Sequence, residues 1–124
     1  EAMGWERNNK IKSLILNGYF SSLLLNIEGK KCHKNSKIKF LIDKYYKNQN
    51  EPINLNIVIN NNKKKMIQIE NTINNELIMN FNCKVNSKNK IEFNIENPKS
   101  LYDLKKGLNR NKRSIILNSI EIND

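Results

Sequence analysis

The chain has 124 residues, enough for one domain with a single hydrophobic core and too few for two. Lys and Arg number 22 against 12 Asp and Glu, which gives a formal net charge of +10 and admits an anionic partner. Only three of these cations are Arg, and the Lys residues are spread through a sequence rich in Asn and Ile. A nucleic-acid reader would concentrate Arg and stacking aromatics on one element, so a solvated basic surface is favoured over nucleic-acid binding.

The most apolar stretch, residues 14–27, is interrupted by Asn, Gly and Ser. No run approaches the roughly 20 apolar residues needed to cross a bilayer, and none resembles a signal peptide, so we expect no membrane insertion by this segment. The sequence starts abruptly at Glu1 and ends on a strand-like segment. We therefore expect residues 1–124 to be a single domain that was excised from, or is appended to, a larger protein.

Apolar and polar residues alternate through most of the chain, which is the pattern of half-buried β-strands. In residues 37–43, for example, Ile38, Phe40 and Ile42 share one face. Eight strands are predicted in this way, at residues 10–16, 20–27, 37–43, 53–60, 66–70, 77–85, 90–96 and 114–122. Their number and spacing predict an all-β fold, a two-sheet antiparallel β-sandwich of the jelly-roll kind, with a barrel as the alternative. The Asn- and Lys-rich turn at 60–65 predicts a hairpin.

The two cysteines lie in different surroundings. Cys83 shares its parity with Met79, Phe81 and Val85, so it is predicted to be buried and unpaired. Cys32 lies in the polar stretch "GKKCHKN" and is predicted to be exposed, so no disulfide between the two is expected. One His and two Cys are too few for the four paired ligands of a structural zinc site, and neither a metal nor a cofactor is predicted.

The strand pattern is interrupted between residues 97 and 113. Pro98 ends a strand because it lacks the amide that a ladder requires. Ser100 followed by Asp103 is a variant of the helix-capping signature, and Gly107 is a candidate C-terminal cap. We therefore predict one short helical turn near 100–107. In the last strand, both Leu117 and Ile120 can face inward only with a bulge near residues 118–119.

This interrupted stretch carries a resemblance to a known family. The segments "IEFNIENPKSLYDL" and "NRNKRSIILNSIEI" resemble the C-terminal β-sandwich module of bacterial surface-polysaccharide glycosyltransferases and phosphoglycerol-transferase-like proteins. The residues that match the family pattern are Asn97, Pro98, Ser100, Asp103, Leu104 and Ile115. The resemblance implies an accessory domain associated with the bacterial cell envelope, and it leaves open the side of the membrane on which the domain lies.

The chain also departs from the family pattern. Leu101 replaces a Pro, and Lys105 and Ser114 replace glycines. Asn109 and Asn111 stand where the family has an acidic residue and an Arg. Arg110 and Arg113 are one or two positions away and are candidate substitutes for that Arg.

No catalytic constellation is visible in the sequence. The single His33 lies in a Lys-rich loop, and four glycines form no phosphate-binding loop. Nothing selects two carboxylates for glycoside hydrolysis from the several Glu residues, which are interpreted as solvent-facing positions of strands. The chain is therefore predicted not to be an enzyme.

Binding is the favoured functional class. Glycans are held by aromatic rings that stack on sugar faces and by amides, carboxylates and Arg that bind hydroxyl groups. The candidate glycan-binding residues are Trp5, Tyr45, Tyr46, Asn61, Tyr102, Arg110 and Arg113. Each aromatic also has a structural interpretation: Trp5 as a partly buried anchor of the N-terminal segment, Tyr45 or Tyr46 as the closure of a strand end, and Tyr102 as a cover over the core.

Three functions remain open on the sequence. The leading one is a non-catalytic carbohydrate-binding accessory domain, whose partner is a glycan or an anionic polysaccharide. The first alternative is a structural or assembly module that positions a neighbouring glycosyltransferase domain of the parent protein. The second alternative is a basic domain that binds an anionic polymer such as nucleic acid.

Overall fold

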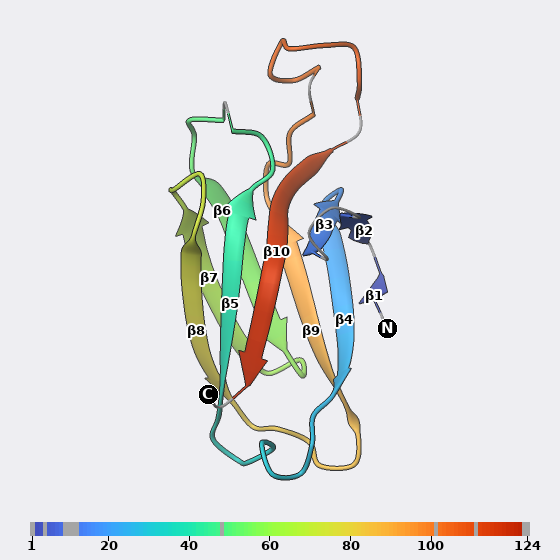
Figure 1. Cartoon of the computed structure of the whole chain (residues 1–124), viewed down its shortest axis with the longest axis vertical. Helices are drawn as coiled ribbons and strands as arrows, with labels where there is room; N and C mark the ends of the chain where they lie inside the picture. Colours follow the sequence, from blue (N-terminus) through green and yellow to red (C-terminus); the bar gives the residue numbers. More distant parts are fainter. Residues whose placement is uncertain are drawn as a thin grey trace.

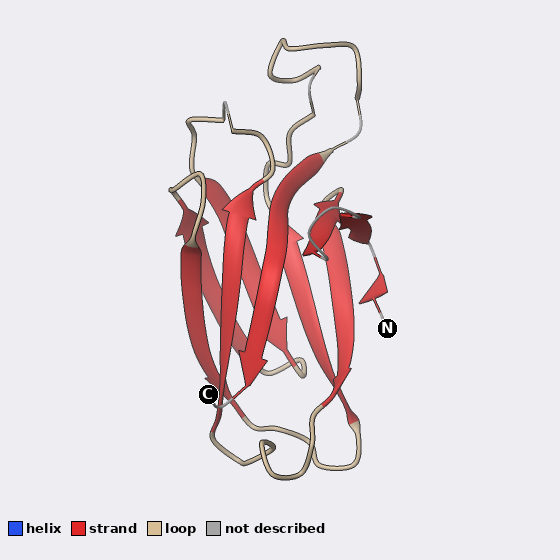
Figure 2. Ribbon diagram, viewed as in Figure 1, coloured by secondary structure: helices blue, strands red, loops and turns tan. Residues whose placement is uncertain are grey.

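The structure is a computed structural model that describes residues 2–3, 5–8, 13–47, 49–100, 102–110 and 112–122, with side chains from Leu14 onward. The described residues form ten β-strands in two antiparallel five-stranded sheets that pack face to face (Figures 1 and 2). This confirms the predicted all-β sandwich. None of the described ranges contains a helix long and apolar enough to cross a membrane.

The first sheet has the strand order β1-β4-β9-β6-β7, and the second has the order β2-β3-β10-β5-β8. The strands of the first sheet are β1 (Ala2–Met3), β4 (Phe20–Asn26), β9 (Lys88–Ile95), β6 (Ile53–Ile59) and β7 (Lys63–Ile69). Those of the second are β2 (Trp5–Asn8), β3 (Ser13–Asn17), β10 (Arg113–Ile122), β5 (Ser36–Lys44) and β8 (Asn75–Phe81). From β3 onward, only the β6–β7 connection stays within one sheet.

The core lies between the sheets and is built from the inward-facing residues of each strand. In β5 these are Ile38, Phe40 and Ile42, which are fully buried as their alternation predicts. Phe40 meets Phe93 of the opposite sheet edge to face, with ring centroids 5.6 Å apart. Burying a side chain of this size contributes about 1.5–3 kcal/mol, so these layers hold the two sheets together.

Two local predictions are confirmed. The β6–β7 hairpin pairs Ile59 with Lys63 across residues 60–62. Asn60 and Asn61 both have positive φ, which Asn tolerates better than most residues and which tight hairpin turns require. In β10 the register with β5 shifts between Leu117 and Ser119, which is the expected bulge. Strands β1 and β2 were not predicted, and residues 10–12 of the first predicted strand lie outside the described residues.

The predicted helical turn is present as hydrogen-bonded turns, and the described residues of this segment form no helix. The Leu104 amide donates to the Ser100 carbonyl (3.1 Å), and the Ser100 hydroxyl accepts from the Asp103 amide (3.2 Å). Asp103 in turn accepts from the Ser100 amide (2.9 Å), so the capping signature forms. The left-handed residue is Lys105, with φ of 59°, rather than the predicted cap Gly107, and it turns the chain away from helical geometry. Leu101 lies outside the described residues.

The prediction of two unpaired cysteines is wrong. Cys32 and Cys83 form a disulfide with a Cα–Cα distance of 5.2 Å, and both residues are buried. The loop after β4 folds back beside the end of β8, where the Cys83 amide donates to the His33 carbonyl (3.0 Å). Burial of Cys83 was predicted correctly, but the polar neighbours of Cys32 concealed its inward direction. Val85 is exposed because β8 ends at Phe81, before the alternation in the sequence does.

Side-chain amides also stabilise the end of the sandwich that carries the disulfide. Asn89 is fully buried, and its oxygen accepts from the Asn60 side chain (2.9 Å) and from the Lys84 amide (2.8 Å). The oxygen of Asn60 accepts from the Lys90 amide (2.8 Å). We call this the disulfide end, which comprises residues 27–35, 60–62 and 82–87. The opposite end, the loop end, comprises the described parts of the long loops 45–52 and 96–112 and residues 18–20, the turn before β4 and its first residue (Figure 1).

Candidate functional site

The long loop between β9 and β10 is fixed by backbone hydrogen bonds. At its base, the Arg113 amide donates to the Lys99 carbonyl (2.8 Å), and the Gly18 amide donates to the Lys112 carbonyl (3.0 Å). Further out, the Tyr102 amide donates to the Asn109 carbonyl (2.9 Å). This last bond folds the two arms of the loop together and brings Tyr102 close to the residue that follows Asn109.

That neighbour is Arg110, whose guanidinium carbon lies 4.1 Å from the centroid of the Tyr102 ring. At this distance the cation is attracted by the face of the ring. Tyr102 nevertheless remains 46% exposed. It lines a cavity of about 620 Å³ together with Asp103, Lys105, Gly107 and Leu108. The structure therefore brings together two of the predicted binding residues, Tyr102 and Arg110, beside an open cavity.

Asp103 is the anionic group of this cavity. It accepts hydrogen bonds from the Lys112 side chain and from the hydroxyl (2.9 Å) and amide (2.9 Å) of Ser100. The bond from Lys112, followed by those from Ser100, lowers the pKa of Asp103 from 3.8 to about 2. Asp103 is therefore ionised near neutral pH, and its carboxylate can accept a hydrogen bond from a hydroxyl group.

Tyr45, Tyr46 and Arg113 form a second group at the loop end. The rings of Tyr45 and Tyr46 pack edge to face with centroids 4.8 Å apart, and the Arg113 guanidinium carbon lies 5.6 Å from the Tyr45 centroid. Tyr46 is only 8% exposed, too little to present a face to a sugar ring. This group therefore packs against the end of the sandwich, with Tyr45 and Arg113 at its edge.

The two remaining candidates do not join these groups. Asn61 lies in the β6–β7 turn at the disulfide end, opposite the long loops (Figure 1). Trp5 belongs to β2 at the edge of the second sheet, and its side chain lies outside the described part of the structure. Neither residue contributes a described side chain to the loop end.

Two exposed aromatic residues at this end, Tyr19 and Phe20, were not predicted as site residues. They follow the Asn17-Gly18 turn and are 60% and 40% exposed. The Tyr19 carbonyl accepts from the Ile95 amide (2.9 Å), so this turn adjoins the base of the long loop. Together with Tyr102, these residues are the exposed large aromatics among the described side chains, and all three lie at the loop end. The signal in the sequence was the turn dipeptide, which presents the following residues at a strand end.

Buried Lys44 was also missed. Its amino group donates to the carbonyls of Gln49 (3.1 Å) and Glu51 (3.2 Å), which ties loop 45–52 to the end of β5. The signal was present in the alternation, because Lys44 has the same parity as the inward-facing Phe40 and Ile42. Lys44 thus has a structural role in supporting the loop end.

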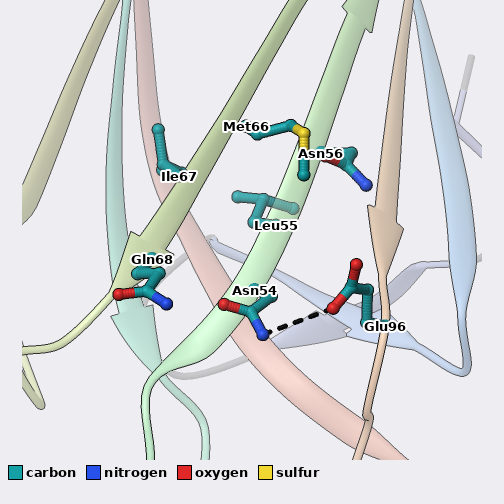
Figure 3. Close-up of a pocket in the computed structure, with 7 residues that line it drawn as sticks. All are labelled: Asn54, Leu55, Asn56, Met66, Ile67, Gln68 and Glu96. Atoms are coloured by element: carbon teal, nitrogen blue, oxygen red, sulfur yellow. Dashed lines mark hydrogen bonds between the residues drawn. The ribbon is translucent and has the colours of Figure 1, made fainter.

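A separate shallow groove lies on the outer face of the first sheet, across β7, β6 and β9 (Figure 3). It has a volume of about 330 Å³ and is lined by Asn54, Leu55, Asn56, Met66, Ile67, Gln68 and Glu96. The Asn54 amide points toward Glu96 and donates to its carboxylate (3.3 Å). Along one cross-strand row, Met66 pairs with Asn56, Asn56 with Asn94, and Asn94 with Phe20. Phe20 therefore links this amide-rich face to the loop end.

No cluster of three or more His, Cys, Asp or Glu that could hold a metal ion occurs in the described part of the chain. The described side chains thus offer hydrogen-bonding groups, cations and aromatic rings as the chemistry of the loop end.

Comparison with known proteins gives a fold and no family. No protein-family model matches the chain, and no curated protein matches it. Among solved structures, the chain is similar to an exo-beta-1,3-galactanase from Phanerochaete chrysosporium with galactose (TM-score 0.51, 11% identity, 94% of this chain and 27% of that one). It is also similar to a family two carbohydrate esterase from Cellvibrio japonicus (TM-score 0.50, 10% identity, 97% of this chain and 29% of that one).

The chain spans less than a third of either solved structure. At this level of identity the similarity is one of fold alone. This chain therefore has a β-sandwich fold that also occurs within carbohydrate-active enzymes.

Proposed function

We propose that this chain is a non-catalytic carbohydrate-binding domain and that its loop end holds the glycan. The observation that carries the proposal is the position of the exposed aromatic rings: Tyr19, Phe20 and Tyr102 all lie at this end, while the other described aromatics are buried or half-buried. An aromatic face excludes water from the apolar C–H face of a sugar ring, and the polar groups around it bind the hydroxyl groups.

The cavity beside Tyr102 supplies those polar groups. The ionised carboxylate of Asp103 accepts hydrogen bonds from hydroxyls, and Lys105 and Arg110 donate them. The exposed Lys106 adds positive charge to the same loop. Arg110 is presented on the Tyr102 ring and can grip a carboxylate or phosphate with two parallel hydrogen bonds, so an acidic polysaccharide suits this end best.

The resemblance of residues 90–122 supplies the biological setting of the proposal. It suggests an accessory domain of a bacterial cell-envelope protein that makes or modifies a surface polysaccharide, next to a catalytic glycosyltransferase domain. The fold shared with parts of carbohydrate-active enzymes supports this setting without specifying a sugar.

The test is binding to a glycan panel that includes polygalacturonate and its methyl ester, which share a backbone and differ in charge. We expect the chain to bind polygalacturonate, and Tyr102→Ala to weaken binding at least tenfold with an unchanged melting temperature. Asn61→Gly, at the opposite end, is the matched control and should bind as the original chain does. If Tyr102→Ala bound the glycan as tightly as the original chain, the site beside Tyr102 would be excluded. If only Met66→Lys lost binding, the site would instead be the groove on the first sheet. Firm binding of duplex DNA at physiological salt, without binding to any glycan, would overturn the proposal.

A second candidate function is assembly with a neighbouring domain, and one feature of the second sheet favours it. Ile78 is exposed on the outer face of this sheet, where Ile15, Leu41 and Ile116 are half-buried. Such an aliphatic face suits protein contact better than sugar contact. If assembly is the function, Ile78→Lys should abolish association with the catalytic domain of the parent protein and leave glycan binding intact.

A further inference from the structure

We infer that this domain matures in an oxidising compartment outside the cytoplasm, where Cys32 and Cys83 are joined by thiol–disulfide exchange. The inference goes beyond the proposed function and does not depend on it, because it rests on the disulfide end of the molecule. It also decides a point that the resemblance leaves open, namely the side of the membrane on which the domain lies.

The first step is the placement of the bond within the core. Both cysteines of the sequence take part in it. Their exposed fractions are 4% and 6%, and both belong to the hydrophobic cluster between the sheets. Solvent thiols therefore have poor access to the sulfur atoms. Regulatory disulfides are instead exposed and readily exchanged, so this bond has the character of a structural disulfide.

The Cys32–Cys83 disulfide joins the loop of residues 27–35 to the end of β8. Cys32 belongs to the segment that follows β4 of the first sheet, and Cys83 follows β8 of the second, 51 residues away in the chain. The described side chains of the loop are otherwise mainly polar or charged, such as Lys30 and Lys34. The loop is also held by hydrogen bonds, among them those from the Cys83 amide to the His33 carbonyl (3.0 Å), from the His33 amide to the Ser36 hydroxyl (2.7 Å) and from the Ser36 hydroxyl to the Lys31 carbonyl (3.1 Å). The disulfide therefore cross-links this loop to the residues that follow β8, in addition to the continuation of the chain into β5.

The last step is the redox environment. Glutathione and thioredoxin keep thiols reduced in the cytosol, whereas structural disulfides form and persist in the periplasm and outside the cell. The two thiols lose two protons and two electrons as the S–S bond forms. The electrons pass to the disulfide of an oxidised exchange catalyst, which becomes a dithiol. A domain that needs this bond is thereby assigned to the outer side of the cytoplasmic membrane.

The experiment measures both the location of the domain and the state of its thiols in cells that make the protein. Lys64 is exposed on edge strand β7, so Lys64→Cys adds one accessible thiol to the two buried cysteines. Intact cells are treated with a membrane-impermeant maleimide. We expect labelling of Lys64→Cys in intact cells and no labelling of the unmodified protein until it is unfolded and reduced, when two thiols become reactive.

A second measurement tests whether the loop depends on the bond. Reduction of the purified chain should lower its melting temperature by about 10 °C or more, and reoxidation should restore it. The inference would be overturned if Lys64→Cys reacted only after lysis, or if acid-trapped cells held the native domain with two free thiols. An unchanged melting temperature after reduction would also overturn it. None of these outcomes depends on glycan binding.

Discussion

The two ends of the sandwich are held by different kinds of interaction. The disulfide end is fixed by a covalent bond and by the buried amides of Asn60 and Asn89. The loop end is fixed by backbone hydrogen bonds and by the exposed ion pair of Asp103 and Lys112. Exposed lysines occur at both ends, whereas the exposed aromatic rings among the described side chains, Tyr19, Phe20 and Tyr102, lie at the loop end. The covalent bond and the exposed aromatic rings therefore lie at opposite ends of the long axis of the molecule.

The largest loss of stability is expected when the Cys32–Cys83 disulfide is removed. A disulfide that joins residues 51 positions apart stabilises a protein by about 4 kcal/mol, because it restricts the unfolded chain. Cys83→Ser should lose about that amount in urea denaturation, and the reduced original chain should behave in the same way. A loss that appears in the variant and not in the reduced chain would show that packing of the serine, and not the missing bond, is the cause.

A smaller loss is expected from the buried amide network at the same end. Asn89→Ala removes the acceptor of the Lys84 and Asn60 bonds and leaves buried polar groups without partners. We expect a loss of about 3 kcal/mol in the free energy of unfolding, measured with urea. Asn82→Ala is the matched control, because the side chain of Asn82 is exposed, and it should change stability by less than about 0.5 kcal/mol. Equal losses in both variants would contradict the network.

The smallest effect should come from acid at the loop end. The pKa of Asp103 is about 2 in the folded chain, below its ordinary value of 3.8, so its contribution to stability is present above pH 3.8 and is lost as the pH falls toward 2. A carboxyl NMR titration should show a midpoint near 2. Lys112→Met should raise the midpoint toward the ordinary value, whereas Lys106→Met should not move it. An unchanged midpoint in Lys112→Met would contradict the claim that Lys112 lowers the pKa of Asp103.

The strands could be predicted because a two-layer fold leaves an alternating pattern in the sequence. Phe40 and Ile42 show the pattern plainly, and even buried Lys44 obeys it. The disulfide could not be predicted, because a loop of polar residues gives no sign of the direction in which Cys32 points. The contact between Tyr102 and Arg110 depends on the backbone hydrogen bond from Tyr102 to Asn109 within a long loop. An irregular loop has no hydrophobic periodicity in its sequence, so this contact could not be predicted.

The candidate site was therefore predicted in part. Tyr102 and Arg110 do lie together at an exposed end, but Asn61 lies at the opposite end of the sandwich. Tyr19 and Phe20 were not among the predicted site residues, although Phe20 was correctly placed at the start of a strand, because the sequence does not show that this strand end adjoins the long loop. Loop residues find their neighbours through tertiary folding, and sequence spacing alone does not give those neighbours.

The most direct test of the division between the two ends is an NMR titration of the labelled chain with oligogalacturonate. We expect the amide chemical shifts to change at residues 18–20, 45–47 and 99–113 and to stay constant at the disulfide end, residues 27–35, 60–62 and 82–87. Changes centred on the disulfide end, or no changes with any acidic or neutral glycan, would contradict the assignment of binding to the loop end.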